Sequence, residues 1–224
     1  MSPDVRRPGL LTSLQNDLER LYEIRVPLAV EDFVLTDRAQ VSDLAEPPPA
    51  DTREALFLVE DADGWSVALF VDEDVVAHLD ADDPRDALHD GNLADFCIAL
   101  EGVSHFIYMA WRAQRDRPVT QLELEMQAEV DKFAASAMFL GRQGNGQVPR
   151  DLSHRLFAGA RYLPGLAAEE RERYERANDY AGRFCGALEK RYMRSMEGAG
   201  MTRELRRFYR LDQRQKIQHI ETAG

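Results

Sequence analysis

The segment ALFLVEDADGWSVALFV, residues 55–71, contains the clearest β-strand signals in the chain. Residues 55–59 and 65–71 are rich in β-branched and aromatic side chains, which favour strands. Between them, Asp61-Ala62-Asp63-Gly64 supplies turn chemistry, because Gly64 tolerates a positive φ. The segment therefore predicts a β-hairpin.

The hairpin lies within an acidic N-terminal region of short helices and extended segments. A first helix is expected around Leu14 to Tyr22, followed by an extended run over residues 28–35 and a connection that ends at Pro47-Pro48-Pro49, where neither a helix nor a central strand continues. Residues 72–79 fit either a strand or a helix, and residues 84–90 fit a short helix. We expect residues 1–91 to form a small acidic α+β unit.

Strand signals disappear after Asn92. Helices are expected over residues 93–114, 120–139, 152–163 and 167–193, and in a last segment after Thr202. Thr120 and Glu123 form a capping box, which gives Glu123 a structural role. The predicted fold is α+β, with the small N-terminal hairpin unit packed on a mainly helical C-terminal bundle, residues 92–224, of about five helices.

Charge is distributed unevenly along the chain. The 224 residues carry a net charge of −12, yet residues 1–100 hold 23 acidic and 7 basic residues, whereas residues 101–224 hold 17 acidic and 21 basic ones. Packing of the two oppositely charged halves against each other explains this pattern. No run of 18 apolar residues and no signal-peptide pattern occurs, so we expect a cytoplasmic protein with no membrane association.

A carboxylate interrupts the apolar face of the helix expected over residues 120–139. At 100° per residue, Leu122, Met126, Val130 and Phe133 share one face, and Glu129 lies within it. A carboxylate in that position is either buried or directed at a pocket. Glu129 is therefore a candidate functional residue.

The preceding helix carries a matching polar stripe. Residues 93–112 are apolar on nearly every side except one, which holds Glu101, His105, Tyr108 and Arg112. Two neighbouring helices thus place ionisable groups where packing alone favours none. A site between the two helices is the resulting hypothesis.

The two helices together carry four residues of types that commonly bind metal ions. Glu101 and His105 are four residues apart, as are Glu125 and Glu129, and this spacing directs each pair from one helix face. Three carboxylates and one imidazole suit a divalent metal ion such as Zn, Mn or Fe in a helical bundle. The spacing is common and no known metal motif is present, so this hypothesis rests on geometry alone.

A metal-free site would use an overlapping set of residues. Burial raises the pKa of a glutamate towards the range used in acid–base catalysis, so Glu129 and His105 could form an acid–base pair. Arg112 would then bind an anionic group of the substrate and Tyr108 would donate a hydrogen bond. Either version gives an enzyme, with hydrolysis as the expected reaction class.

The alternative is a non-catalytic interaction or adaptor protein. In that case Arg112 or Lys132 neutralises Glu129 or Glu125, and the stripe on the first helix simply faces solvent. The acidic N-terminal surface and the arginine-rich last helix would bind partners. The sequence identifies neither a small-molecule nor a protein ligand.

The last helix also allows other partners. Its basic residues are interleaved with Phe208 and Tyr209, as in nucleic-acid-binding surfaces. An overall pI near 4.9 argues against nucleic-acid binding. Docking of this helix onto the acidic N-terminal unit explains the same residues, and homodimerisation through it stays open.

Overall fold

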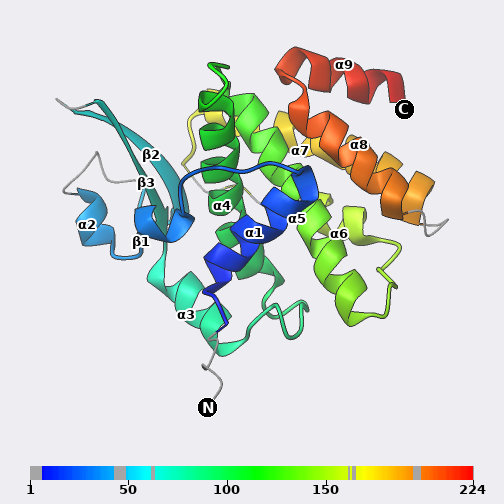
Figure 1. The fold of residues 1–224 in the computed structure, drawn as a ribbon, viewed down its shortest axis with the longest axis horizontal. Helices are drawn as coiled ribbons and strands as arrows, with labels where there is room; N and C mark the ends of the chain where they lie inside the picture. The colour runs from blue at the N-terminus through cyan, green and yellow to red at the C-terminus, as the bar shows by residue number, and fades with distance from the viewer. Residues whose placement is uncertain are drawn as a thin grey trace.

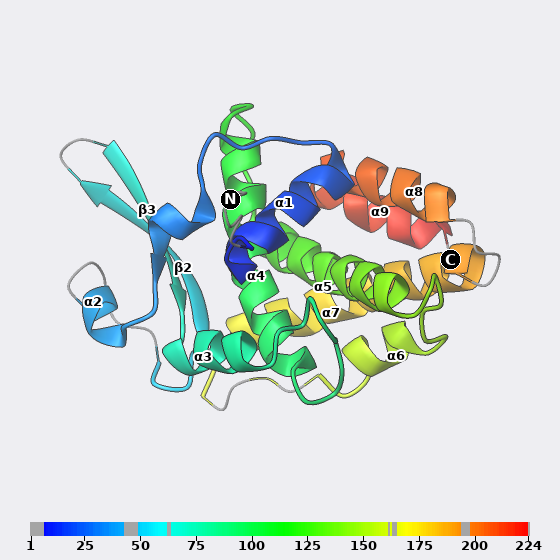
Figure 2. The ribbon, with the colours of Figure 1, turned by 60° about the horizontal axis from the view of Figure 1, so that its bottom comes forward.

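The protein combines a small sheet with a larger set of helices (Figure 1). The computed structural model describes residues 7–42, 49–61, 64–160, 162, 165–193 and 198–223. The sheet lies at one end of the molecule and the helices extend away from it (Figure 2). The α+β fold with a mainly helical bundle is confirmed.

The predicted hairpin forms the sheet. Strand β2 (Glu54–Asp61) pairs with β3 (Gly64–Val71) in antiparallel register, with Leu56 opposite Leu69. The two-residue strand β1 (Val34–Leu35) joins β3 in parallel, so the strand order is β1-β3-β2. The predicted turn residues 62 and 63, and residues 43–48 of the expected proline connection, fall outside the described residues.

The expected extended run over residues 28–35 is largely wrong. Half of it is the 3-10 helix η1 (Val30–Phe33), and only Val34 and Leu35 form a strand, β1. Gln15 of helix α1 (Leu10–Tyr22) donates to the carbonyl of Leu28 and accepts from the amide of Val30, both at 2.8 Å. These bonds satisfy backbone groups that a longer strand would have paired.

Short helices complete the N-terminal part. Helix α2 (Arg38–Ser42) precedes the hairpin, and α3 (Glu73–Ala81) follows it, which decides between the two options left open for residues 72–79. Asp72 caps α3 by accepting from the amide of Asp74. The helix expected over residues 84–90 does not form; these residues make turns that the buried Asn92 side chain stabilises through the carbonyls of Asp82 and Ala87.

Helices dominate the rest of the described chain. In order they are α4 (Leu93–Ala113), α5 (Gln121–Gln143), α6 (Leu152–Phe157), α7 (Ala168–Leu188) with its π-helical continuation η2 (Glu189–Met193), α8 (Gly198–Arg210) and α9 (Gln213–Ala223). The expected last helix is two helices, α8 and α9. Residues 211–212 separate them. The amide of Gln213 donates a hydrogen bond to the Glu123 carboxylate of α5, so it does not extend the hydrogen-bond pattern of α8.

Helix α4 lies at the centre of this arrangement. It contacts α1, α3, α5 and both long strands, and α5 in turn packs on α7. Helix α4 is long and apolar enough to cross a membrane, but most of that stretch is buried inside the protein. Its apolar surroundings explain why nearly all of its faces are hydrophobic, and they leave its polar side chains in buried positions.

Helix α8 packs on α1, as the charge pattern predicted for the arginine-rich segment. The Arg206 side chain donates to the carbonyl of Leu21 and pairs with Glu23 at 2.5 Å. Arg210 donates to the carbonyl of Tyr22. These arginines therefore cover the carboxyl end of α1, where the helix dipole favours positive charge.

Candidate metal centre

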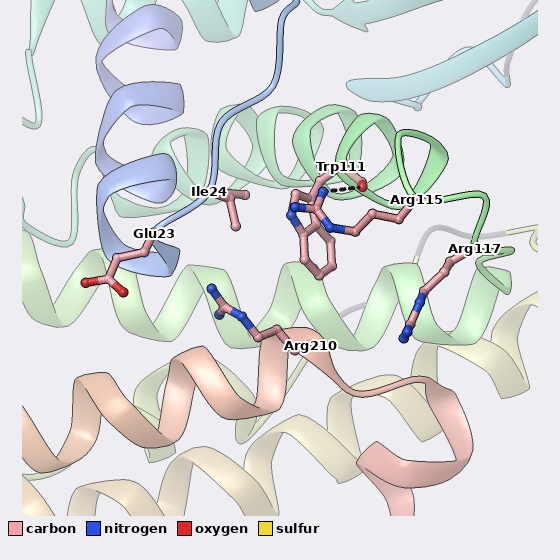
Figure 3. Close-up of a pocket in the computed structure, with 6 residues that line it drawn as sticks. All are labelled: Glu23, Ile24, Trp111, Arg115, Arg117 and Arg210. Atoms are coloured by element: carbon pink, nitrogen blue, oxygen red, sulfur yellow. Dashed lines mark hydrogen bonds between the residues drawn. The ribbon is translucent and has the colours of Figure 1, made fainter.

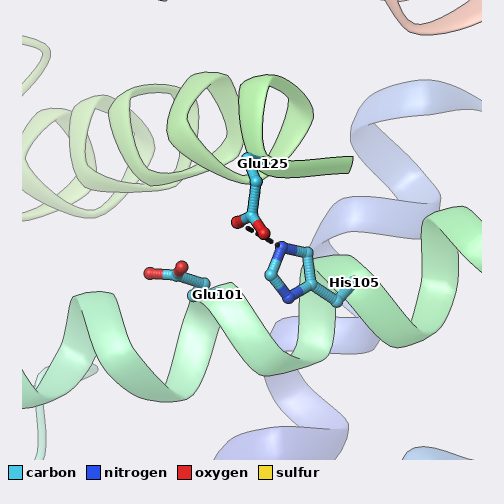
Figure 4. Close-up of side chains that lie close together, drawn as sticks. All are labelled: Glu101, His105 and Glu125. Carbon is cyan, nitrogen blue, oxygen red and sulfur yellow. Dashed lines mark ion pairs between the residues drawn. The ribbon is translucent and has the colours of Figure 1, made fainter. Parts of the chain in front are cut away.

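Three of the predicted ligands meet between α4 and α5. Glu101 and His105 of α4 and Glu125 of α5 each place one donor atom within 4.8 Å of the others (Figure 4). Donor atoms around a single ion at about 2.1 Å lie at most ~4.2 Å apart. Side-chain shifts of less than about 1 Å would therefore bring all three onto one ion.

His105 is held between two carboxylates. Its Nδ1 lies 3.3 Å from Glu54 Oε1, and its Nε2 lies 3.3 Å from Glu125 Oε2. The Nε2 atom is fully buried and makes no well-directed hydrogen bond to any described residue. A carboxylate on one ring nitrogen, with the other nitrogen facing a candidate ligand, is the usual environment of a metal-binding histidine.

Glu54 was not predicted as a site residue. It begins strand β2, and it reaches His105 because α4 approaches the sheet closely at Gly102. A Cβ atom added at Gly102 would lie 2.8 Å from Leu69 Cδ1 and 3.0 Å from Glu54 Cγ. Gly102 thus allows the contact between the sheet and the site.

Glu129 lies at the edge of the cluster rather than among the three ligands. Lys132 contacts Glu129 Oε1 at 2.8 Å and Glu101 Oε2 at 3.0 Å. The predicted ion pair of Lys132 with Glu129 is therefore present. The expectation that the α4 stripe faces solvent is wrong, because Glu101 is only partly exposed and His105 is buried.

The cluster has a surplus of negative charge. Five carboxylates, two cations and one imidazole are linked by ion-pair contacts; they are Glu54, Glu101, Glu125, Glu129, Glu170, Lys132, Arg173 and His105. With a neutral imidazole the sum is three negative charges. A bound divalent cation or bound protons would offset most of this surplus.

The pKa shifts agree with this need for positive charge. Burial raises the pKa of Glu54 and of Glu129 despite the opposing effects of His105 and Lys132. Burial alone would lower the pKa of His105, but Glu125 and Glu54 outweigh it and raise that pKa well above its ordinary value. A proton on His105 therefore takes the place that a metal ion would compete for.

Helix α7 covers the cluster. Arg173 Nε lies 3.9 Å from Glu125 Oε1, and Glu125, Glu101 and Glu54 add to burial in raising the pKa of the neighbouring Tyr174. The Tyr174 ring stacks on Tyr162, with centroids 6.4 Å apart. Both tyrosines are partly exposed.

The structure does not bring Tyr108 and Arg112 to this cluster. Tyr108 donates to Glu123 Oε1 at 2.5 Å, and Arg112 contacts the same oxygen at 3.3 Å. Arg112 also donates to the carbonyl of Pro118. The predicted contact of Arg112 with Glu129 or Glu125 is therefore replaced by one with Glu123.

The capping-box interpretation of Glu123 is half right. Thr120 accepts from the amide of Glu123 at 3.1 Å, as a cap should. The Glu123 carboxylate, however, accepts from Tyr108 and from the amide of Gln213, which joins α5 to α9. Its role is structural, but through tertiary contacts.

A second buried polar network is centred on Asp131 and lies near Glu123. Asp131 accepts hydrogen bonds from Tyr22, Ser104 and Gln127, and burial raises its pKa to about 6. Gln127 in turn accepts from Lys216 of α9, whose side chain is completely buried. Burial lowers the pKa of Lys216 to about 7, although Glu123 and Asp131 oppose the shift.

One sequence signal could have pointed to both networks. Only three of the 28 basic residues are lysine, and two of these three, the partly buried Lys132 and the completely buried Lys216, lie beside carboxylates. A rare, charged residue type within an apolar helix pattern indicates that a specific contact requires that side chain. Glu54 gives no such signal, because its role depends on the position of the sheet.

No family model, curated protein or solved structure matches the chain.

Proposed function

We propose that this protein is a metal-dependent hydrolase whose divalent ion is held by Glu101, His105 and Glu125. One observation carries the proposal: three donor atoms converge from two helices while Glu54 contacts the opposite nitrogen of His105. Glu54 would fix the ring orientation and make the imidazole a better ligand. Packing alone gives no reason for this combination.

The donor set favours a borderline first-row ion. Two carboxylates and one imidazole suit Zn, Mn or Fe, whereas Mg and Ca prefer oxygen ligands throughout. Three protein ligands also leave a position for water, as in catalytic centres. An ion bound there would polarise a substrate carbonyl or phosphoryl group and lower the pKa of water.

The neighbouring residues have roles consistent with hydrolysis. Glu129 lies beside the three ligands, and its raised pKa suits a group that accepts a proton from water. Lys132 would hold Glu129 in place through their 2.8 Å contact. Arg173, at the edge of the cluster, would stabilise negative charge that develops on the substrate.

Metal content is the test of this proposal. Tag-free protein is stripped of metal, exposed separately to zinc, manganese and ferrous ions, desalted and analysed by mass spectrometry. Wild-type protein should retain about one ion per chain, and His105→Ala and Glu125→Gln should lose it. His219→Ala is a matched control, because His219 is also largely buried and pairs with Glu204 at 2.6 Å.

Two outcomes would contradict the metal site. Wild-type protein that retains none of the three ions would make the cluster a set of buried ion pairs. Equal loss of metal in His105→Ala and His219→Ala would indicate a general effect on folding. Circular dichroism of each variant distinguishes misfolding from loss of a ligand.

The hydrolase part has a separate test. Metal-loaded protein is assayed with p-nitrophenyl acetate and bis(p-nitrophenyl) phosphate, which represent the ester and phosphodiester classes. Glu129→Gln should keep the ion and lose about 10²-fold or more of the rate, as expected for removal of a general base. An unchanged rate in Glu129→Gln would remove this residue from the mechanism.

A further inference from the structure

A cleft of about 490 Å³ lies where helices α1, α4 and α8 end (Figure 3). Its volume is in the range of small-molecule binding sites. Its lining residues lie outside the candidate metal centre; they are Glu23, Ile24, Trp111, Arg115, Arg117 and Arg210.

The cleft is positively charged in an otherwise acidic protein. Arg115, Arg117 and Arg210 line it, whereas the whole chain has a net charge of −12. None of the three guanidinium groups forms an ion pair with a carboxylate in the part of the chain that the structure describes. Glu23, the one lining carboxylate, is already paired with Arg206. All three arginines are solvent-exposed, and among the described residues their charges have no anionic partner.

Two of the arginines are held in fixed orientations. The Arg115 guanidinium stacks on the Trp111 ring, 4.5 Å from its centroid, and donates to the Trp111 carbonyl. Arg210 donates to the carbonyls of Arg206 and Tyr22. Each guanidinium has five N–H donors, so both keep donors for a ligand after these contacts. Binding would therefore cost little side-chain entropy.

Trp111, which lines the cleft, also carries an unsatisfied donor. Its Nε1 atom is buried and has no hydrogen-bond partner among the described residues. The indole N–H can only donate, and a buried donor without an acceptor is unfavourable. A small shift of the Trp111 ring would let a ligand oxygen accept from it.

A structural explanation covers part of this arrangement. Three helix carboxyl ends meet here, and their carbonyl groups attract positive charge. Arg115 and Arg210 bond such carbonyls, so they need no ligand to explain them. Arg117, which has no partner among the described residues, and Trp111 Nε1 are not explained in this way.

We propose that this cleft binds a phosphorylated small molecule with two or more negative charges. The planar fork of a guanidinium matches phosphate oxygens in bidentate geometry. Three cations require more than one negative charge for neutralisation. The volume exceeds the needs of a bare phosphate ion and leaves room for an organic group.

Calorimetric titration with inorganic pyrophosphate tests this proposal. Pyrophosphate chelates metals, so protein and buffer are first treated with a chelating resin, and His105→Ala serves as a second, metal-site-free background. Wild-type protein and His105→Ala should bind pyrophosphate equally. Arg117→Gln should weaken binding about tenfold or more, as expected for loss of a charge-assisted contact. Arg207→Gln, an exposed arginine of α8 outside the cleft, should bind like wild type.

Three results would overturn the proposal. One is the absence of saturable pyrophosphate binding by wild-type protein at low ionic strength. Another is equal weakening by Arg117→Gln and Arg207→Gln, which would indicate general attraction between charges. The third is displacement of pyrophosphate by a single-stranded oligonucleotide that binds more tightly through the same Arg117, because the phosphates would then belong to a nucleic acid.

Discussion

Glu54 connects the sheet to the candidate metal centre through a single contact with His105. A histidine that binds metal through Nε2 needs an acceptor at Nδ1, and removal of such acceptors lowers metal affinity by about 10–100-fold. Glu54→Gln keeps the shape of the side chain but removes its charge. We expect about tenfold weaker binding with unchanged stoichiometry, measured by competition with a chromogenic zinc chelator.

The matched control is Glu204→Gln, which alters the partner of the other largely buried histidine, His219. Its metal affinity should equal that of wild type. If Glu54→Gln and Glu204→Gln had the same affinity, Glu54 would have no role at the metal.

Helical geometry explains which site residues could be predicted. The i, i+4 spacing placed Glu101 with His105 correctly. Arg112 projects from the same helix face as His105. It lies about 10 Å further along the helix axis, however, which is too far for the two side chains to join one site. Glu123 and Glu125 are separated by 200° around α5 and therefore join different networks. The capping box with Thr120 correctly separated Glu123 from the ligand candidates, but helical spacing does not show which neighbouring element covers each face of α5.

Among the elements, α4 and the sheet depend on one glycine for their close approach. Alanine in place of an exposed helical glycine usually stabilises a protein by about 1 kcal/mol. At Gly102 a Cβ would collide with Leu69 and crowd Glu54. We expect Gly102→Ala to lower the free energy of unfolding by about 1–3 kcal/mol, measured by urea denaturation.

Gly186→Ala provides the comparison within another helix. In α7 the nearest atom to a new Cβ is Ser153 Oγ at 3.9 Å, an ordinary contact. This variant should be as stable as wild type or up to about 1 kcal/mol more stable. Equal effects of Gly102→Ala and Gly186→Ala would contradict the role assigned to the close approach.

Helix α9 is attached to the protein interior by a buried lysine. Lys216 Nζ lies 4.6 Å from the Tyr108 ring centroid and 4.8 Å from that of Phe208. Its pKa of about 7 means that the unfolded chain binds a proton between pH 7 and 10.5 that the folded protein does not. The free energy of unfolding therefore rises with pH in this interval, by about 1.4 kcal/mol per pH unit for this group.

Lys216→Met removes the charge and keeps the length of the side chain. We expect it to stabilise the protein by about 1–4 kcal/mol at pH 7, with an advantage that shrinks towards pH 10. Urea denaturation at several pH values measures this, with the exposed Lys190→Met as control. A loss of stability at pH 7, or an advantage that grows with pH, would contradict the buried-lysine account.

At the scale of the whole molecule, local patterns predicted the elements better than their positions. The β-branched and aromatic residues around the turn in residues 55–71 and the apolar pattern of residues 93–114 specified the hairpin and α4, because each signal lies entirely within the element that it predicts. Residues 28–35 and the break between α8 and α9 depend on bonds to Gln15 and Glu123, which are distant in sequence. Tertiary contacts of this kind are not visible in local periodicity.

The central claim concerns one position in space, between α4 and α5. Crystals soaked in zinc, with X-ray data collected on both sides of the zinc absorption edge, would locate any bound ion directly. The account predicts an anomalous peak about 2.0–2.2 Å from His105 Nε2 and from carboxylate oxygens of Glu101 and Glu125. A cluster without a peak, in which Lys132 still bridges Glu101 and Glu129, would contradict it.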